Sequence, residues 1–126
     1  MTVKEHLQFY AYIKGIPPEK HEEMVQTAMD DVLLSKFANF KVSELSGGMK
    51  RRVSVAISLV SDPKIIFLDE PSTGLDPENR RQLWDIIANL KGKRAMMLTT
   101  HSMEEADVLC NRIAIVNNGI LRCIAP

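Results

Sequence analysis

The 126-residue chain has no excess of charge of either sign, because Lys and Arg together number 16 and Asp and Glu together also number 16. A general nucleic-acid-binding protein usually carries a marked basic excess, so this balance argues against that class. Long apolar runs are missing too, and none approaches the roughly 20 residues that a membrane-spanning helix needs. We therefore expect the chain by itself to be soluble or peripheral to a membrane.

Cysteine and glycine are scarce as well. Cys110 and Cys123 stand in no metal-ligand or redox spacing, and we expect both to be buried small apolar residues of a reduced, cytoplasmic protein. The N-terminal residues are charged early and lack the shape of a secretory signal. Only 6 glycines are present, yet Gly47 and Gly48 are adjacent, directly before an apolar segment. Either they form a loop before a helix, or the backbone comes close to an anionic ligand there.

What the sequence does contain is a change of periodicity near residue 62. Before it, apolar residues recur at helical spacing, which predicts helices over 3–14, 18–34 and 49–61. After it, short apolar runs alternate with helical segments, which predicts strands at 65–69, 94–100 and 112–119 and helices at 80–91 and 102–110.

This order predicts an α/β fold in which a helical subdomain over 1–62 precedes a sheet-containing part over 63–126. Strands that alternate with helices and are continuously apolar are typical of a parallel sheet covered on both faces by helices. Asn118-Gly119 is a strong hairpin signal, so the last pair of strands should be antiparallel.

The first two predicted strands end in polar side chains, at Asp69-Glu70 and at Thr99-Thr100-His101. Ligands of parallel α/β sheets sit at the carboxyl ends of the strands. A carboxylate at such an end can hold Mg²⁺, and a second one beside it can polarise an attacking water. Taken singly, a pair such as Asp69-Glu70 is more often a solvated loop, and a histidine such as His101 is more often a helix-cap neighbour or a satisfied polar residue.

Four motifs in a fixed order resemble the nucleotide-binding domain of ATP-binding cassette (ABC) proteins. "LSGG" at 45–48 is similar to the signature motif, "IIFLDE" at 65–70 to Walker B with its catalytic glutamate, and "STGLD" at 72–76 to the D-loop. His101 resembles the switch histidine. The resemblance implies a P-loop NTPase-like fold with catalytic Glu70 and His101, a metal ligand in Asp69, and nucleotide contacts by Ser46, Gly47, Gly48 and Asp76.

The same resemblance implies the cofactors and partners. ATP and Mg²⁺ are the expected cofactors, and Ser46 with the backbone of Gly47 and Gly48 would face ATP held by a second nucleotide-binding domain. The transmembrane domains of a transporter would place the chain at the cytoplasmic face of a membrane. No nucleic acid is expected, because a solvated face or a contact with the membrane domains explains the basic run Lys50–Arg52 better.

Met49 stands where the family usually has Gln. With "TVKEHLQFYAYIKGI" before it and "THSMEEADVLCNRIAIVNNG" after it, Met49 makes the chain similar to subfamily A, the lipid-exporting full transporters. Bacterial drug- and polysaccharide-export ATPases share some of these features. The resemblance therefore implies transport, with lipids as the substrate class.

The phosphate cradle G-x-x-x-x-G-K-[ST] is missing, since Gly92-Lys93 is followed by Arg94 and lacks the leading glycine. The family's adenine-stacking aromatic and its Q-loop glutamine are missing as well. The chain thus resembles the second half of a nucleotide-binding domain, and two hypotheses follow. It is part of an ATPase, or it is a truncated, non-catalytic fragment that pairs with another cassette and regulates it. A nucleic-acid-binding module would rest on Lys50–Arg52 alone.

Overall fold

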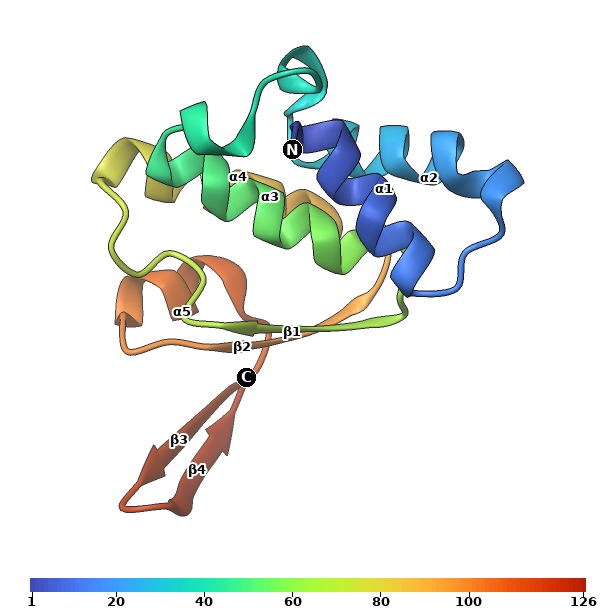
Figure 1. Cartoon of the computed structure of the whole chain (residues 1–126). Helices are drawn as coiled ribbons and strands as arrows, with labels where there is room; N and C mark the ends of the chain where they lie inside the picture. Colours follow the sequence, from blue (N-terminus) through green and yellow to red (C-terminus); the bar gives the residue numbers. More distant parts are fainter.

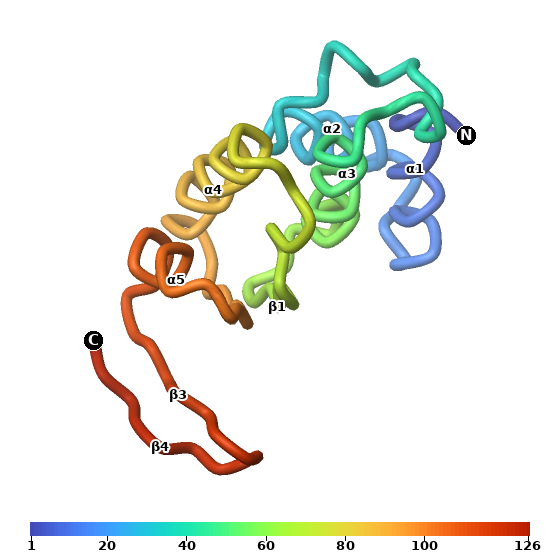
Figure 2. Tube along the Cα trace, turned by 90° about the vertical axis from the view of Figure 1, so that its left-hand side faces the viewer, coloured from blue at the N-terminus to red at the C-terminus, as the bar shows by residue number.

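The computed structural model describes all 126 residues as a helical part, a small parallel sheet and a C-terminal hairpin (Figure 1). In the helical part, α1 (Val3–Ile13), α2 (Pro18–Asp31) and α3 (Gly47–Leu59) lie side by side (Figure 2). Two short 3₁₀ helices, η1 (Ser35–Phe37) and η2 (Val42–Glu44), connect α2 to α3. The three helices predicted from apolar periodicity are confirmed. No helix of the chain is both long enough and apolar enough to cross a membrane.

Local sequence signals set the ends of the first two helices. Thr2 and Glu5 form a capping box at the start of α1, in which Thr2 Oγ1 accepts from the Glu5 amide at 3.2 Å. Gly15 follows α1 with φ of 77°, and Pro18 occupies the first turn of α2. Helix α2 ends at Asp31, before the predicted end at 34, because Leu33 adopts a left-handed φ of 59°.

In the second half, β1 (Ile65–Asp69) and β2 (Ala95–Thr99) pair in parallel, with Asp69 opposite Thr99. Helix α4 (Pro77–Leu90) connects the two strands, and α5 (Met103–Leu109) follows β2. Strands β3 (Ile113–Asn117) and β4 (Ile120–Ala125) form the antiparallel hairpin, turning through Asn118 and Gly119 at positive φ. The α/β class, the parallel pairing of the first two strands and the hairpin are confirmed.

The sheet differs from the prediction in the number of its faces that helices cover. Helices pack on one face of β1 and β2, where Ile66 and Leu68 are buried, whereas Phe67 on the other face is 71% exposed. The hairpin forms a separate sheet and adds no strand to β1 and β2. The prediction of a parallel sheet covered on both faces is therefore wrong for these residues, because no element of the chain packs on the second face.

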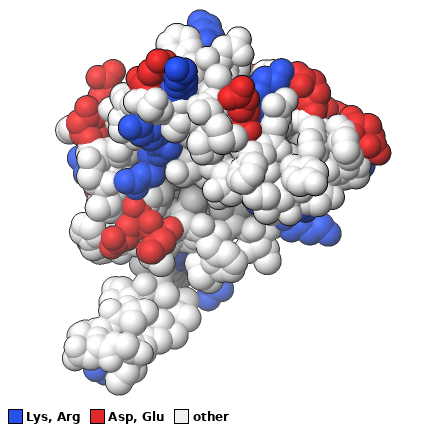
Figure 3. All heavy atoms as spheres, viewed as in Figure 1, with Lys and Arg blue, Asp and Glu red and all other residues white.

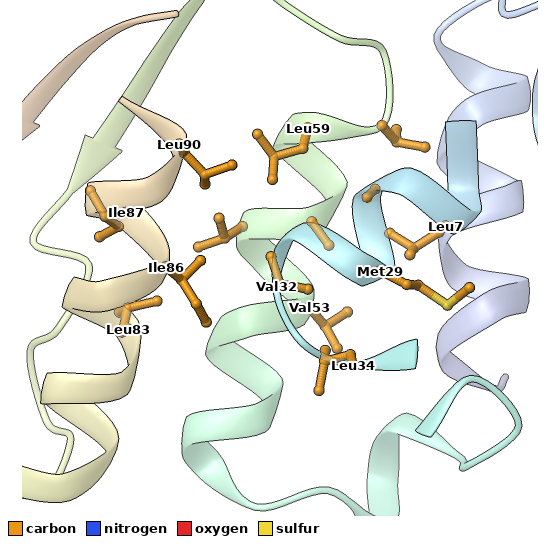
Figure 4. Close-up of a cluster of buried hydrophobic side chains, with 14 of the residues drawn as sticks. Leu7, Met29, Val32, Leu34, Val53, Leu59, Leu83, Ile86, Ile87 and Leu90 are labelled. Atoms are coloured by element: carbon orange, nitrogen blue, oxygen red, sulfur yellow. The ribbon is translucent and has the colours of Figure 1, made fainter. Parts of the chain in front are cut away.

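One hydrophobic cluster joins the helical part to the sheet. Leu7 of α1 meets Met29 of α2, and Leu59 of α3 faces Ile86 and Leu90 of α4 (Figure 4). Because α3 and α4 share this core, their N-termini are held close together, beside the carboxyl end of β1. The cysteines lie outside it: Cys110 is half-buried and Cys123 is exposed, so the expectation that both are buried is wrong.

Candidate functional site

The chain brings Asp69, Glu70 and His101 together at the carboxyl ends of the two parallel strands. Asp69 is the last residue of β1, and Glu70 follows it directly. His101 follows the end of β2, and its Nδ1 lies 3.0 Å from Glu70 Oε1. All three side chains are exposed, so a ligand can reach them. The sequence predicted this meeting from the positions of the strand ends.

Thr99 ties the two strand ends to each other. Its hydroxyl donates to Asp69 Oδ1 at 2.5 Å, and the Glu70 amide donates to the Thr99 hydroxyl and carbonyl oxygens at 3.1 and 3.0 Å. These bonds fix the direction in which the Asp69 and Glu70 side chains leave the sheet. The sequence placed Thr99 at the polar end of the second predicted strand but gave its hydroxyl no role.

Glu70 has an unusual backbone conformation. Its φ is 46°, in the left-handed region that a residue with a side chain seldom adopts. Such a conformation costs on the order of 1–3 kcal/mol and persists only when the surroundings enforce it. The strained residue is the one that the family resemblance assigned to catalysis, and its carboxylate contacts His101.

The donor set at this edge fits a magnesium ion that is shared with a ligand. The chain has no group of three or more His, Cys, Asp or Glu side chains that could hold a metal by themselves. Mg²⁺, however, is usually held by one or two carboxylates, several waters and substrate phosphates. Asp69 uses only Oδ1 in hydrogen bonds within the chain, so its Oδ2 is free to bind such a shared ion.

The predicted signature residues form the N-terminus of α3. Ser46 is the N-cap, and its hydroxyl accepts from the Met49 amide at 3.2 Å. Gly47 is exposed, with no atom close to where a Cβ would stand, whereas Gly48 is buried against Asn79. The free amides of a helix N-terminus favour an anionic group. Ser46 and Gly47 are therefore open to an external ligand or partner, whereas the side of Gly48 that would carry a Cβ is filled by Asn79. Nucleotide contact by Ser46 and by the backbone of Gly47 and Gly48 stays a prediction.

Asp76 lies at the N-terminus of α4. Its side chain accepts from the Asn79 amide at 2.8 Å, so it is the N-cap of that helix, and Pro77 follows in the first helical position. This cap was readable from the sequence as Asp-Pro before a helical segment, although the sequence reading assigned Asp76 to nucleotide contact. The structure shows a structural role for Asp76, and its contact with nucleotide stays a prediction.

Two of the three side chains of the basic run Lys50–Arg52 make hydrogen bonds within the chain. The Arg51 guanidinium donates to the carbonyls of Pro71 and Thr73 at 2.6 and 3.0 Å. Arg52 lies against the end of α2, and burial lowers the pKa of its guanidinium. Lys50 is exposed and the two arginines are half-buried, so the arginines are less free than a solvated face would be, and the contact surface expected for this run stays a prediction. On the face drawn in Figure 3, cationic and anionic side chains are interspersed over the helices, and the hairpin is almost uncharged.

Sequence reasoning missed two residues that hold the turn after Glu70. One is Arg51, and the other is Glu105, a side chain only 1% exposed that accepts hydrogen bonds from Ser72 and Trp84. A signal for Glu105 was present, because it lies four residues before the apolar Leu109 and next to Ala106. Helical spacing therefore places Glu105 on the buried side of α5.

Known proteins resemble this chain along nearly its whole length. Residues 1–73 match the family model described as "ABC transporter". The ABC transporter A family member 2 of Arabidopsis thaliana is 54% identical over 98% of this chain, and the A family member 1 of Dictyostelium discoideum is 47% identical over 98%. The ATP-binding cassette sub-family A member 2 of Rattus norvegicus is 46% identical over 98%. The chain spans 13, 14 and 5% of these three relatives, respectively.

A solved structure of an ABC transporter in an inward-facing conformation has the same fold. It aligns with a TM-score of 0.86 at 21% identity, over 97% of this chain and 52% of that one. The family model covers more than half of the chain, and three relatives from the A family or sub-family A match nearly all of it. The chain therefore belongs to the ABC transporter family and has the fold of part of that family's cassette.

Proposed function

We propose that this segment supplies the hydrolytic residues of an ATP site in the nucleotide-binding domain of an ABC transporter. One observation carries the proposal: the 3.0 Å contact between Glu70 and His101, beside Asp69, at the carboxyl ends of two parallel strands. The carboxyl ends of parallel strands are where α/β folds bind their ligands. The Glu70 and His101 side chains suit phosphoryl transfer to water. Residues 1–62 would form the helical subdomain and residues 63–126 the second half of the ATPase core.

Glu70 would act as the general base. Its Oε1 is engaged by His101, while Oε2 has no hydrogen-bond partner in the chain and can accept a proton from an attacking water. His101 would orient the Glu70 carboxylate and contact the terminal phosphate with the exposed part of its ring. Asp69 would hold Mg²⁺, which neutralises charge on the phosphate oxygens when it is bound with the nucleotide.

The N-terminus of α3 would act on a different nucleotide. Ser46 and Gly47 are exposed, and Ser46 with the backbone of Gly47 and Gly48 would bind ATP held by a second nucleotide-binding domain. The two domains together would drive the transmembrane domains of a transporter at the cytoplasmic face of a membrane. The A-family relatives support transport as the overall activity, and we propose lipids as the substrate class.

The experiment compares ATP hydrolysis by the complete cassette that contains this segment with hydrolysis by three of its variants. Glu70→Gln keeps the shape of the side chain and removes the base, so it should bind ATP normally and lose about 10²–10⁴-fold in turnover. Asp69→Asn should raise the Mg²⁺ concentration needed for half-maximal rate. Glu104→Gln is the matched control, because Glu104 is an exposed glutamate near His101, and its rate should not change.

The result that would contradict this function is full turnover in the Glu70→Gln cassette. The 126 residues alone should show no ATP hydrolysis in the same assay, because they contain no G-x-x-x-x-G-K-[ST] motif to bind the phosphates. Steady Mg²⁺-dependent hydrolysis by these residues alone, lost on Glu70→Gln, would mean that the cradle is dispensable and that the division of roles proposed here is wrong.

A further inference from the structure

The turn that follows β1, residues 70–73, needs support from outside itself. Glu70 has a left-handed φ of 46°, and the internal bond of the turn, from the Thr73 amide to the Glu70 carbonyl, is 3.2 Å long. Pro71 and Ser72 are buried, so the turn is packed between helices although Glu70 itself is exposed. Any shift of this turn moves the Glu70 carboxylate relative to His101.

Arg51 of α3 holds the turn from one side. Its Nη1 donates to the Pro71 carbonyl at 2.6 Å and lies 3.4 Å from the Glu70 carbonyl, and its Nη2 donates to the Thr73 carbonyl at 3.0 Å. A guanidinium presents several donors in a rigid plane, so one side chain can bridge consecutive carbonyls in a way that an ammonium cannot. Arg51 therefore fixes the path of the backbone through the turn.

Glu105 of α5 holds the turn from the other side. Its Oε2 accepts from the Ser72 hydroxyl and, at 2.9 Å, from the indole Nε1 of Trp84 on α4. The side chain is 1% exposed and makes no ion pair with any Lys, Arg or His. Burying a carboxylate without a cation is costly unless hydrogen bonds compensate. Packing alone would be served as well by an apolar residue, so the carboxylate indicates a need to fix Ser72.

The position of Glu105 in the chain links this contact to the other side of the site. Helix α5 begins at Met103, immediately after His101 and the N-cap Ser102, whose hydroxyl accepts from the Glu105 amide at 3.3 Å. Glu105 therefore ties the first turn of α5 to the turn that carries Glu70. The 3.0 Å contact between His101 and Glu70 spans the same two segments.

We propose that Arg51 and Glu105 are positioning residues for ATP hydrolysis: together they clamp the turn 70–73 between α3 and α5 and so hold Glu70 against His101. This inference rests on the function proposed above. Since Arg51 lies on α3, whose N-cap is Ser46, these contacts also connect the N-terminus of α3, which would face the partner, to the hydrolytic carboxylate.

The test measures steady-state ATP hydrolysis by the complete cassette, well below its unfolding temperature. Glu105→Gln and Arg51→Lys should each lower kcat about 10²-fold with little change in the KM for ATP, the size of effect expected when a reacting group is misplaced by about 1 Å. The matched controls are the exposed neighbours, Glu104→Gln and Lys50→Met, which should keep the wild-type kcat. A kcat equal to that of the controls in both clamp variants would overturn the proposal.

A second measurement, which does not depend on ATP hydrolysis, reports on the hydrogen bond between Glu105 and the Trp84 indole. Trp84 is the only tryptophan of the chain, and its indole N–H signal in a ¹H–¹⁵N spectrum is identified by its loss in Trp84→Phe. Glu105→Gln should shift that signal and Glu104→Gln should leave it in place. If Glu105→Gln does not fold, Ser72→Ala removes one bond and keeps the carboxylate, and it should lower kcat without changing the KM. An unshifted indole signal, or a Ser72→Ala cassette with full kcat, would contradict the proposal.

The two proposals fail in different ways. Loss of hydrolysis in Glu70→Gln, with wild-type activity present, supports the proposed ATP site whatever the clamp variants do. If the clamp variants then retain full kcat, only the positioning role is wrong. If the wild-type cassette and Glu70→Gln turn over equally, the ATP site itself is wrong.

Discussion

Gly48 packs against Asn79 so closely that a Cβ added to Gly48 would lie 2.4 Å from Asn79 Oδ1 and 3.0 Å from Asn79 Cβ. This contact joins the second residue of α3 to the first turn of α4. Gly47 beside it has open space around it. The two adjacent glycines are therefore explained differently. Gly48 has no room for a side chain beside Asn79, whereas Gly47 is exposed and has room for one.

Gly48→Ala should consequently destabilise the protein, because the added methyl overpacks the contact with Asn79. We expect a loss of about 1–3 kcal/mol in the free energy of unfolding, measured by urea denaturation. Asn79→Ala removes the two nearest atoms but leaves Cβ, so the double variant should recover part of the loss. Gly47→Ala is the control and should fall within about 0.5 kcal/mol of wild type. Equal effects of the two glycine substitutions would show that the packing contact is unimportant.

The uncovered face of β1 and β2 should make the 126 residues self-associate in isolation. Ile65, Phe67 and Met97 are 58, 71 and 62% exposed on strands that carry no charged side chain before Asp69, and such edges and faces recruit other chains. Light scattering after size exclusion should show oligomers that become smaller when Phe67 and Met97 are both replaced by Thr. A chain that is monomeric at all concentrations would contradict this expectation.

The two cysteines should differ in reactivity. Burial raises the pKa of the Cys110 thiol; the Lys91 ammonium opposes the rise and the Glu105 carboxylate adds to it. The thiolate is the nucleophile, so at mildly alkaline pH iodoacetamide should modify the exposed Cys123 before Cys110. A raised pKa in the fold also means that stability contributed by Cys110 is present below the ordinary thiol pKa and is lost as pH rises toward the raised value. Mass spectrometry of the labelled peptides checks the order, and faster labelling of Cys110 would refute it.

Much of this arrangement was open to prediction from the sequence because it depends on local rules. The periodicity of apolar residues located the helices, and the rule that ligands bind at the carboxyl ends of parallel strands predicted that Glu70 and His101 lie at the same edge. The turn at Asn118-Gly119 located the hairpin.

The other features depend on tertiary contacts, which the sequence does not show directly. An exposed Phe67 and a buried Ile66 look alike in a continuously apolar strand, so the sequence could not say that one face of the sheet lacks a cover. The spacing of Glu105 from Leu109 places Glu105 on the buried side of α5, but the sequence cannot say which groups its carboxylate meets there; the structure identifies them as Ser72 and Trp84. Arg51 likewise reads as surface charge until the turn 70–73 is seen beside it.

Mixing two inactive cassettes tests the central claim most directly, because that claim places Glu70 and the N-terminus of α3 in different ATP sites. One complete cassette carries Glu70→Gln. The other carries Gly47→Asp, which the open space around Gly47 tolerates and which puts a negative charge where a phosphate should approach. In a mixed pair, one ATP site then receives both changes and the other receives neither. The account predicts that each variant alone is nearly inactive and that the mixture hydrolyses ATP well above either one; a mixture no more active than the separate variants would contradict it.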